Sequence, residues 1–170
     1  KKIIEFTRNN LFLILICLLF SITRLYKINE IPSSVYWDEA SIGYNAYAVL
    51  TTGKDEWGET LPLHFRAFGE FKLPVYIYSV VVSESVFGLT QFAVRLPAVI
   101  FGLLSVIGLY LLVFEITKRK EIALLSSFIF SLTPWFFIFS RTGYEATAGL
   151  AFFTFAIYFL IKAFEKKRYL

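Results

Sequence analysis

Residues 96–114 read LPAVIFGLLSVIGLYLLVF, a run without a single charged side chain. A helix needs about 20 apolar residues to cross the ~30 Å hydrocarbon core of a bilayer. Ile122–Ser140 and Ala146–Ile161 are similarly uncharged, and Lys162 extends the last run because its ammonium group can reach the interface. The carboxyl-terminal half of the chain is therefore predicted to cross the membrane three times, over residues 95–114, 121–140 and 146–164.

The composition of the whole chain agrees with a membrane protein. Hydrophobic residues make up 57% and aromatic residues 19% of the sequence, and the mean hydropathy is +0.64. The net charge is +4, but the lysines and arginines flank the apolar runs and do not gather on a polar face, so they indicate topology. We therefore predict an all-α integral membrane protein that contacts membrane lipids and has no nucleic-acid partner.

A fourth span is predicted at the amino terminus, over residues 7–26, with Arg8 and Arg24 near its ends. The span is too long for a signal-peptide core and no small-residue cleavage site follows it, so we expect it to be retained. Its Cys17 is the chain's only cysteine, which excludes a disulfide framework. Because the chain has no methionine and ends just after the basic residues 166–168, we expect a single membrane module, residues 1–170, from the amino-terminal part of a longer protein.

The apolar segment Leu73–Leu89 is short and carries Glu84, and it decides the topology. If it spans, the basic clusters at 118–120 and 166–168 lie on the opposite side from the basic amino terminus. If it is interfacial or re-entrant, all three basic clusters are cytoplasmic, as the positive-inside rule favours. We prefer the second topology, with four spans, a cytoplasmic amino terminus and an external loop at 27–94, in the plasma membrane.

The external loop is predicted to contain juxtamembrane helices. Residues 38–52 carry Ile42, Ala46, Val49 and Leu50 at helical spacing, so an amphipathic helix on the membrane surface is expected. Ser33 or Ser34 is able to cap its start, and Gly53 ends it. A turn-rich connection over residues 51–63 follows.

The tripeptide Trp37-Asp38-Glu39 begins this helix directly after the first span. Two adjacent carboxylates beside lipid are costly to keep, so they indicate a functional site. The alternative is that both acids only complement the positive end of the helix dipole.

The order of these features resembles the GT-C glycosyltransferases. A short first span is followed by an external Asp-Glu, an amphipathic helix, Lys72-Leu73-Pro74 before a short apolar segment, and Phe92-Ala93-Val94-Arg95-Leu96-Pro97 opening a long span. Ser131-Leu-Thr-Pro-Trp135 and Ser140-Arg141-Thr-Gly-Tyr-Glu145 are similar to the family's third span and second external loop. The likeness is closest to bacterial dolichyl-phosphate-mannose protein mannosyltransferase-like and aminoarabinose-transferase-like proteins, and it covers only their amino-terminal module.

The resemblance implies an enzyme that transfers a sugar from a polyprenyl phosphate to a protein, lipid or glycan acceptor on the outer face. Asp38 matches the first acid of the family's Asp-Glu motif and is the expected catalytic base, with Glu39 as its partner. Lys72, Arg95 and Arg141 are expected to stabilise the departing phosphate of the donor, because fixed cations suit that charge. The alternative for the arginines is anchoring at lipid headgroups.

Glu145 is the candidate second acid, since related enzymes carry an acidic residue after the third span. A divalent metal is a possible cofactor, with Asp38, Glu145 and Glu70 as candidate ligands. The pattern departs from the family in two ways: no aspartate precedes Glu145 as an Asp-x-Glu, and Phe71 separates Glu70 from Lys72. Glu145 acting only as a helix-start acid stays an equal alternative.

Two further features leave alternatives open, and a third concerns the shape of a span. His64 is a ligand or base, or, as is commoner, a surface residue. Trp37 and Tyr44 either stack on a sugar or belong to the interfacial aromatic belt. Pro134 is expected to kink the third span.

The hypothesis of a different class is a non-catalytic membrane subunit or transporter fragment whose external loop binds a partner. A catalytically dead relative is a further alternative. The glycosyltransferase hypothesis predicts inversion at the anomeric carbon by direct displacement, and loss of transfer when Asp38 becomes Asn.

Overall fold

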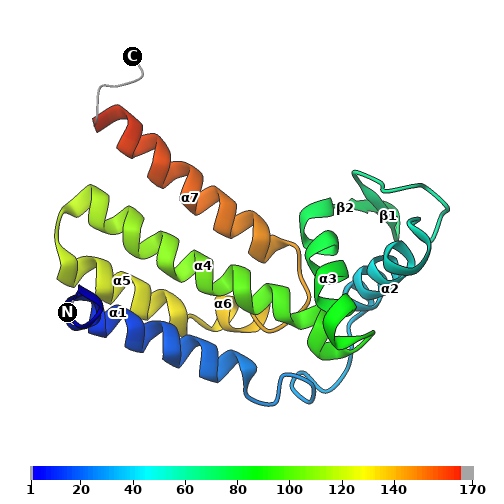
Figure 1. The fold of residues 1–170 in the computed structure, drawn as a ribbon, viewed down its shortest axis with the longest axis horizontal. Coiled ribbons are helices and arrows are strands. Elements are labelled where there is room, and N and C mark those ends of the chain that lie inside the picture. The colour runs from blue at the N-terminus through cyan, green and yellow to red at the C-terminus, as the bar shows by residue number, and fades with distance from the viewer. Residues whose placement is uncertain (1, 166–170) are drawn as a thin grey trace.

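The computed structural model describes the backbone of residues 2–165, and side chains are considered for residues 10–164. The basic residues 166–168, which entered the topology prediction, lie outside this range. The described chain is mostly helical and consists of a bundle with a smaller lobe at one end (Figure 1).

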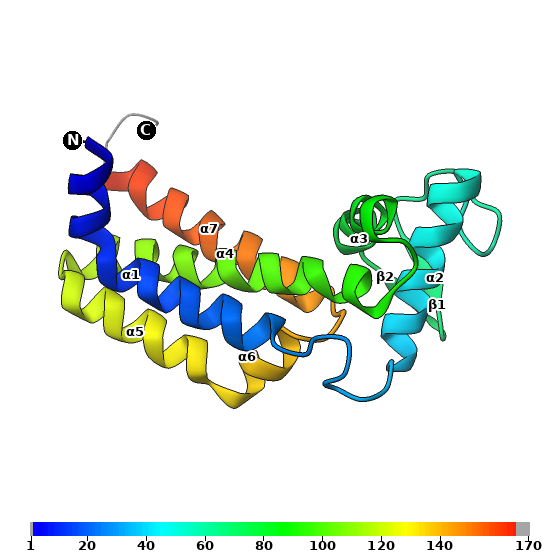
Figure 2. The same ribbon diagram turned by 60° about the horizontal axis from the view of Figure 1, so that its bottom comes forward.

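Four helices run along the bundle: α1 (Lys2–Leu25), α4 (Gln91–Thr117), α5 (Lys120–Leu132) and α7 (Ala146–Glu165). The α4 helix is central and contacts the other three. The start of α1, the α4–α5 turn and the end of α7 all lie at the end of the bundle away from the lobe (Figures 1 and 2). The described basic cluster at 118–120 is therefore separated from the lobe by the length of α4.

Two of the predicted spans are single helices long and apolar enough to cross a membrane, Gln91–Thr117 and Ala146–Phe164. The apolar part of α1, Asn10–Leu25, is shorter. The backbone of Asn10 leaves helical geometry, with φ −118° and ψ 16°, and kinks α1 there.

The third predicted span, residues 121–140, is interrupted at Pro134, where the sequence analysis expected a kink. The α5 helix ends at Leu132, and a separate short helix, α6 (Pro134–Phe139), follows. Pro134 has no N–H to donate and disfavours helical geometry in the residue before it. Thr133 accordingly has φ −59° and ψ 125°, so the predicted kink is a complete break.

The lobe contains α2 (Trp37–Thr52), the strands β1 (Phe65–Ala67) and β2 (Glu70–Lys72), and α3 (Pro74–Phe87). The strands form an antiparallel hairpin, which the sequence analysis did not predict. The α3 helix lies across the direction of the bundle and beside α2 (Figures 1 and 2).

The predicted helix over 38–52 is present with one correction at its start. Its N-cap is Tyr36, so the expected cap by Ser33 or Ser34 is wrong, because an extended stretch separates them from the first turn. The Tyr36 N–H donates to the Glu39 carboxylate at 3.2 Å. Gly53 ends the helix in the left-handed region at φ 72°, as predicted.

The apolar face of α2 packs into the lobe and is not left free for a lipid surface. Ile42, Ala46 and Val49 join a buried cluster with residues of α3 and α4. Full burial of an Ile or Val side chain stabilises by roughly 1.5–3 kcal/mol. Packing between α2, α3 and the hairpin therefore fixes the first turn of α2 in place.

Candidate functional site

The hairpin carries Lys72 toward the first turn of α2. Lys72 pairs with Phe65 across the strands, and both side chains are buried on the inner face of the hairpin. Asp38 lies on the facing turn of α2 and is 7% exposed. A lysine this deeply buried needs a charged partner, and the fold supplies one.

Lys72 and Tyr144 both contact the Asp38 carboxylate. Lys72 Nζ lies 2.5 Å from Oδ1, and the Tyr144 hydroxyl donates to Oδ2 at 2.7 Å. Lys72 Nζ also lies 2.5 Å from Oε1 of Glu70, whose side chain is 61% exposed. The ammonium group therefore bridges a buried and an exposed carboxylate, and the Glu70 side faces solvent.

The protonation states follow from these contacts. Burial alone would raise the pKa of Asp38, but the hydrogen bonds from Lys72 and Tyr144 and the Lys72 charge outweigh it, and the pKa lies below its usual value. Burial would likewise lower the pKa of Lys72, but Asp38 and Glu70 raise it. Burial and the bond to Asp38 raise the pKa of Tyr144 to about 12. At neutral pH the site holds a carboxylate, an ammonium and a neutral phenol.

Glu145 reaches the same region from the other side. Its Oε2 accepts the backbone N–H of Leu73, next to Lys72, at 2.8 Å. Burial raises the pKa of Glu145, with opposing contributions from the Leu73 N–H and Lys72. Glu145 thus ties the connection before α7 to the hairpin that carries Lys72.

Glu39 points away from Asp38 and forms a buried pair with Arg95 in the second turn of α4. The carboxylate receives two guanidinium bonds, from Nε at 2.8 Å and from Nη2 at 3.1 Å. It also accepts the N–H of Gly143 at 2.8 Å. Both side chains of the pair are at most 2% exposed, so Glu39 joins α2, α4 and the loop before α7.

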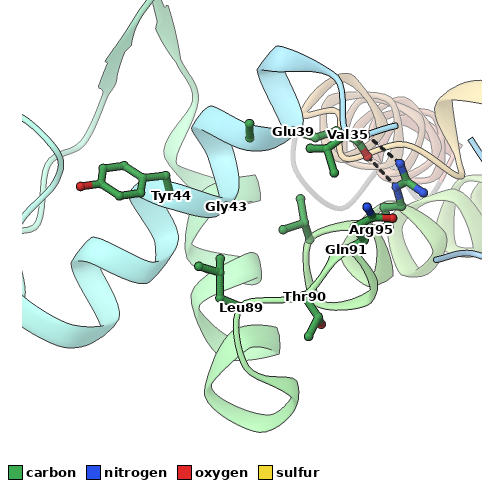
Figure 3. Close-up of a pocket in the computed structure, with 10 residues that line it drawn as sticks. Val35, Glu39, Gly43, Tyr44, Leu89, Thr90, Gln91 and Arg95 are labelled. Carbon is green, nitrogen blue, oxygen red and sulfur yellow. Dashed lines mark hydrogen bonds and ion pairs between the residues drawn. The ribbon is translucent and has the colours of Figure 1, made fainter. Parts of the chain in front are cut away.

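A cavity of about 230 Å³ lies beside the Glu39–Arg95 pair, between α2 and the start of α4. Figure 3 shows the pair at one side, Tyr44 and Leu89 away from it, and Thr90 and Gln91 at the α4 start. The residues that line this cavity are mainly apolar, and they include Tyr44.

The two arginines predicted to bind phosphate mainly contact backbone carbonyls in this structure. Besides Glu39, Arg95 donates to the carbonyls of Ile28, Pro32 and Ser34. Arg141 donates to those of Thr23, Tyr26 and Ile31, at 2.5, 2.6 and 3.0 Å. Both guanidinium groups thereby hold the connection from α1 to α2. Of the nitrogen atoms in these two groups, Arg141 Nε is buried without a hydrogen-bond partner among the described residues.

The structure thus divides the predicted residues into two neighbouring groups. Asp38, Lys72, Glu70 and, through Leu73, Glu145 form one group, and Glu39 with Arg95 forms the other. Within the described part of the chain, no three His, Cys, Asp or Glu side chains are arranged to hold a metal ion. The Lys72 ammonium, itself a cation, lies between the Asp38 and Glu70 carboxylates.

Two contributors were missed from the sequence. Tyr144 was noted only within a family-like motif, although its hydroxyl contacts Asp38. Gly143 contributes its backbone N–H to Glu39. The only signal available was their position directly before Glu145 in a predicted external connection.

The remaining candidates, His64 and Trp37, belong to neither of these two groups. His64 sits on the outer side of the hairpin, with its ring centroid 5.0 Å from that of Phe71. Trp37 stacks on Phe68 of the hairpin turn at 5.4 Å, and both side chains are largely exposed. Trp37 therefore borders the Asp38 group, whereas His64 does not.

Comparison with known proteins identifies the family to which this chain belongs. Residues 72–170, more than half of the chain, match the dolichyl-phosphate-mannose-protein mannosyltransferase family, and the chain belongs to that family. It is also 30% identical over 133 residues to undecaprenyl phosphate-alpha-4-amino-4-deoxy-L-arabinose arabinosyl transferase 2 of Proteus mirabilis (strain HI4320). That match covers 78% of this chain but 23% of the relative, so the chain spans about a quarter of the relative's length. No solved structure matches.

Proposed function

We propose that this chain is the amino-terminal, active-site-bearing part of a membrane glycosyltransferase. The enzyme transfers a sugar from a polyprenyl-phosphate donor to an acceptor hydroxyl, which belongs to a protein, a lipid or a glycan. Family membership supports the reaction class, and the named substrate of the Proteus relative supports a polyprenyl-phosphate carrier. The observation that carries the proposal is the buried Asp38 carboxylate in the lobe, which Lys72 and Tyr144 hold by hydrogen bonds.

In the proposed reaction, Asp38 accepts the proton of the acceptor hydroxyl. The acceptor oxygen bonds to the anomeric carbon as the bond between that carbon and the phosphate oxygen breaks. The electron pair of the broken bond goes to the phosphate, and the configuration inverts. No general acid is required, because a polyprenyl phosphate is a stable anion once it leaves.

Lys72 is proposed to hold the donor phosphate. Glu70 is the exposed member of its two partners, so an incoming phosphate would displace Glu70 from the ammonium at low cost. Once Lys72 turns to the phosphate, its hold on Asp38 weakens and the pKa of Asp38 rises. The carboxylate then becomes a stronger base at the moment when the donor is bound.

Arg95 and Arg141 are proposed to contribute positive charge to the site without leaving their carbonyl partners. Of the nitrogen atoms in these two guanidinium groups, the buried Nε of Arg141 is the one without a hydrogen-bond partner among the described residues. A divalent ion on Asp38, Glu70 and Glu145 stays a prediction from the sequence, and no step above depends on it. Chelator treatment of the active enzyme tests it, since retained transfer after metal removal would contradict the prediction.

The proposed topology has four spans, a cytoplasmic amino terminus and the lobe on the outer face of the plasma membrane. The basic 118–120 turn lies at the far end of the bundle from the lobe, which supports the topology through the positive-inside rule. In the protein as proposed, α3 lies at the interface.

The experiment that tests the function is transfer from a polyprenyl-phosphate sugar by the complete protein in membranes, comparing Asp38→Asn with Glu30→Gln. Asn has nearly the same shape but cannot accept a proton, so transfer should be lost. Glu30 is a surface acid, 64% exposed at its side chain and paired with Lys27, and should tolerate the change. Normal transfer by Asp38→Asn would exclude Asp38 as the base. Absence of transfer by the unsubstituted protein would favour a non-catalytic membrane subunit.

A further inference from the structure

A second hollow lies on the outer face of the hairpin, opposite to the Lys72 side. Arg66 and Phe71 pair across the strands and are exposed, whereas Phe65 and Lys72 pair on the buried inner face. The hollow has a volume of about 320 Å³ and is lined by Asp55, Trp57, Glu59, His64, Arg66 and Phe71. Pockets for small ligands begin at roughly this size.

Several hydrogen bonds hold the loop that forms this hollow. Asp55 is 6% exposed, and its Oδ1 accepts the N–H groups of Trp57 at 3.0 Å and Glu59 at 2.8 Å. The Trp57 indole N–H donates to the carbonyl of Arg66 at 3.1 Å, which joins the loop to β1. The loop is also tied to α2, because the Asn45 amide donates to the Glu56 carboxylate at 2.9 Å. The shape therefore does not depend on a ligand to order it.

The lining combines flat apolar surface with hydrogen-bonding groups of both kinds. Trp57 and Phe71 remain 60% and 57% exposed, although Arg66 lies over the Trp57 ring at 5.2 Å. The two acids supply acceptors, and the Arg66 guanidinium and His64 ring supply donors. Neither sign of charge dominates, so the lining does not favour a strongly charged ligand.

A membrane surface is a poor match for these aromatic rings. The loop between α2 and β1 lies at the end of the lobe away from the bundle helices (Figures 1 and 2). Belt residues that anchor a protein sit instead where spans meet the headgroups. Rings held this far from the spans, with four titratable side chains around them, suit a water-soluble ligand.

We propose that the outer face of the hairpin is a saccharide-binding site. Sugar units present an apolar face to an aromatic ring and hydroxyl groups to acids, arginine and histidine, which is the combination found here. Because β2 carries Phe71 on this face and Lys72 on the other, the bound sugar lies across the hairpin from Asp38 and is not the sugar transferred. In the proposed function it is a unit of a glycan-containing acceptor, and only that role rests on the proposed function.

Binding is measured directly on the complete protein in lipid nanodiscs by saturation-transfer NMR, with a panel of glucose, mannose, N-acetylglucosamine and cellobiose. We expect saturable binding of at least one probe, weakened about tenfold or more by Trp57→Ala and by His64→Ala. Tyr47→Ala, which removes an exposed ring on α2, should leave binding unchanged. His64 is on the surface, so its variant remains informative if Trp57→Ala fails to fold.

Two outcomes would overturn the proposal: no saturable binding by any of the probes, or binding that Trp57→Ala and His64→Ala leave intact. A change of tryptophan fluorescence with phosphatidylcholine–phosphatidylglycerol vesicles that Trp57→Ala removes, without any sugar binding, would assign this face to lipid instead. Asp38→Asn should bind the probes normally. Failure of the transferase mechanism and failure of this site are thereby distinguished.

Discussion

Lys72 Nζ lies 2.5 Å from Oδ1 of Asp38, so the hairpin and the first turn of α2 meet at one buried ion pair. The pair joins residues 34 positions apart. Asp38 stays ionised because of it, and its contribution to stability is complete above the usual carboxyl pKa of 3.8. That contribution is lost as the pH falls through the lower pKa of the folded state.

Replacing Lys72 with Met should change the pH dependence of transfer. Without the ammonium, burial dominates and the pKa of Asp38 rises, so the acid limb of kcat/KM should move to higher pH. The rate should fall by about 10²-fold or more, because one fixed donor to the leaving phosphate is lost. The exposed Lys54 gives the matched control, Lys54→Met, and an unmoved acid limb in Lys72→Met would contradict the proposed base.

Glu39→Ala should destabilise the fold strongly. The change leaves the guanidinium of Arg95, 1% exposed, without its carboxylate, and removing one partner of a buried pair costs roughly 3–5 kcal/mol. Thermal unfolding in detergent measures the loss. Glu30→Ala breaks only an exposed pair, worth about 0–1 kcal/mol, and equal unfolding temperatures for the two variants would refute the structural role given to Glu39.

Gly143→Ala should disturb the same pair from the other side. An added Cβ would lie 2.8 Å from Cγ1 of Val94 and 3.3 Å from Cγ of Glu39. Overpacking of this kind costs roughly 1–3 kcal/mol. A Cβ on Gly149 meets nothing within 4 Å, so Gly149→Ala in α7 should be neutral or stabilising. The comparison uses the same substitution at two positions, and thermal unfolding measures both. If Gly149→Ala lowers stability more than Gly143→Ala does, the side chains around Gly143 move aside at little cost in free energy.

Helical spacing, a C-cap glycine and a proline predicted those features of the fold that depend on residues close together in the sequence. The spacing of Ile42, Ala46 and Val49 predicted α2, and Gly53 marked its end. Pro134 marked the interruption of the third span but not its extent, because a proline signals a missing hydrogen bond and not whether the chain resumes its direction. The hairpin has three-residue strands, too short for any alternation to be recognised.

Long-range contacts set the rest of the site, and the sequence carries little signal for them. Tyr144 and Asp38 are 106 positions apart, and a tyrosine in an apolar chain is more often an interfacial residue. Arginine at the end of a span likewise predicts a headgroup contact, yet Arg141 donates to the carbonyls of Tyr26 and Ile31. Which acceptors are in reach depends on packing that residue type does not reveal.

The proposed topology predicts that a cysteine at the end of α4 and a cysteine just after α6 react differently with a reagent outside the cell. With Cys17→Ser as background, a cysteine at Thr142 should react with a membrane-impermeant reagent in intact cells, and a cysteine at Thr117 should not. Thr142 follows α6 near the lobe, and Thr117 ends α4 at the far end. Permeabilised cells, in which both sites should react, provide the control. Labelling of Thr117 alone would mean that residues 73–89 span, which would place Arg95 and Glu145 on the opposite face of the membrane from Asp38.

Glu84 should make stability fall as the pH rises. Its side chain is 2% exposed on α3, and neither carboxyl oxygen has a hydrogen-bond partner within the described residues. Burial raises its pKa to about 7, so the folded protein keeps a proton that the unfolded chain has already released. Stability therefore decreases from about pH 5 to about pH 8, where folding must hold an ionised carboxylate in an apolar setting.

Glu84→Gln cannot ionise, so its stability relative to the unsubstituted protein should increase across that range in chemical unfolding at several pH values. Glu30→Gln, on the surface, should leave the difference flat, and a flat difference for Glu84→Gln would mean that the carboxylate gains solvent or a partner in the folded protein.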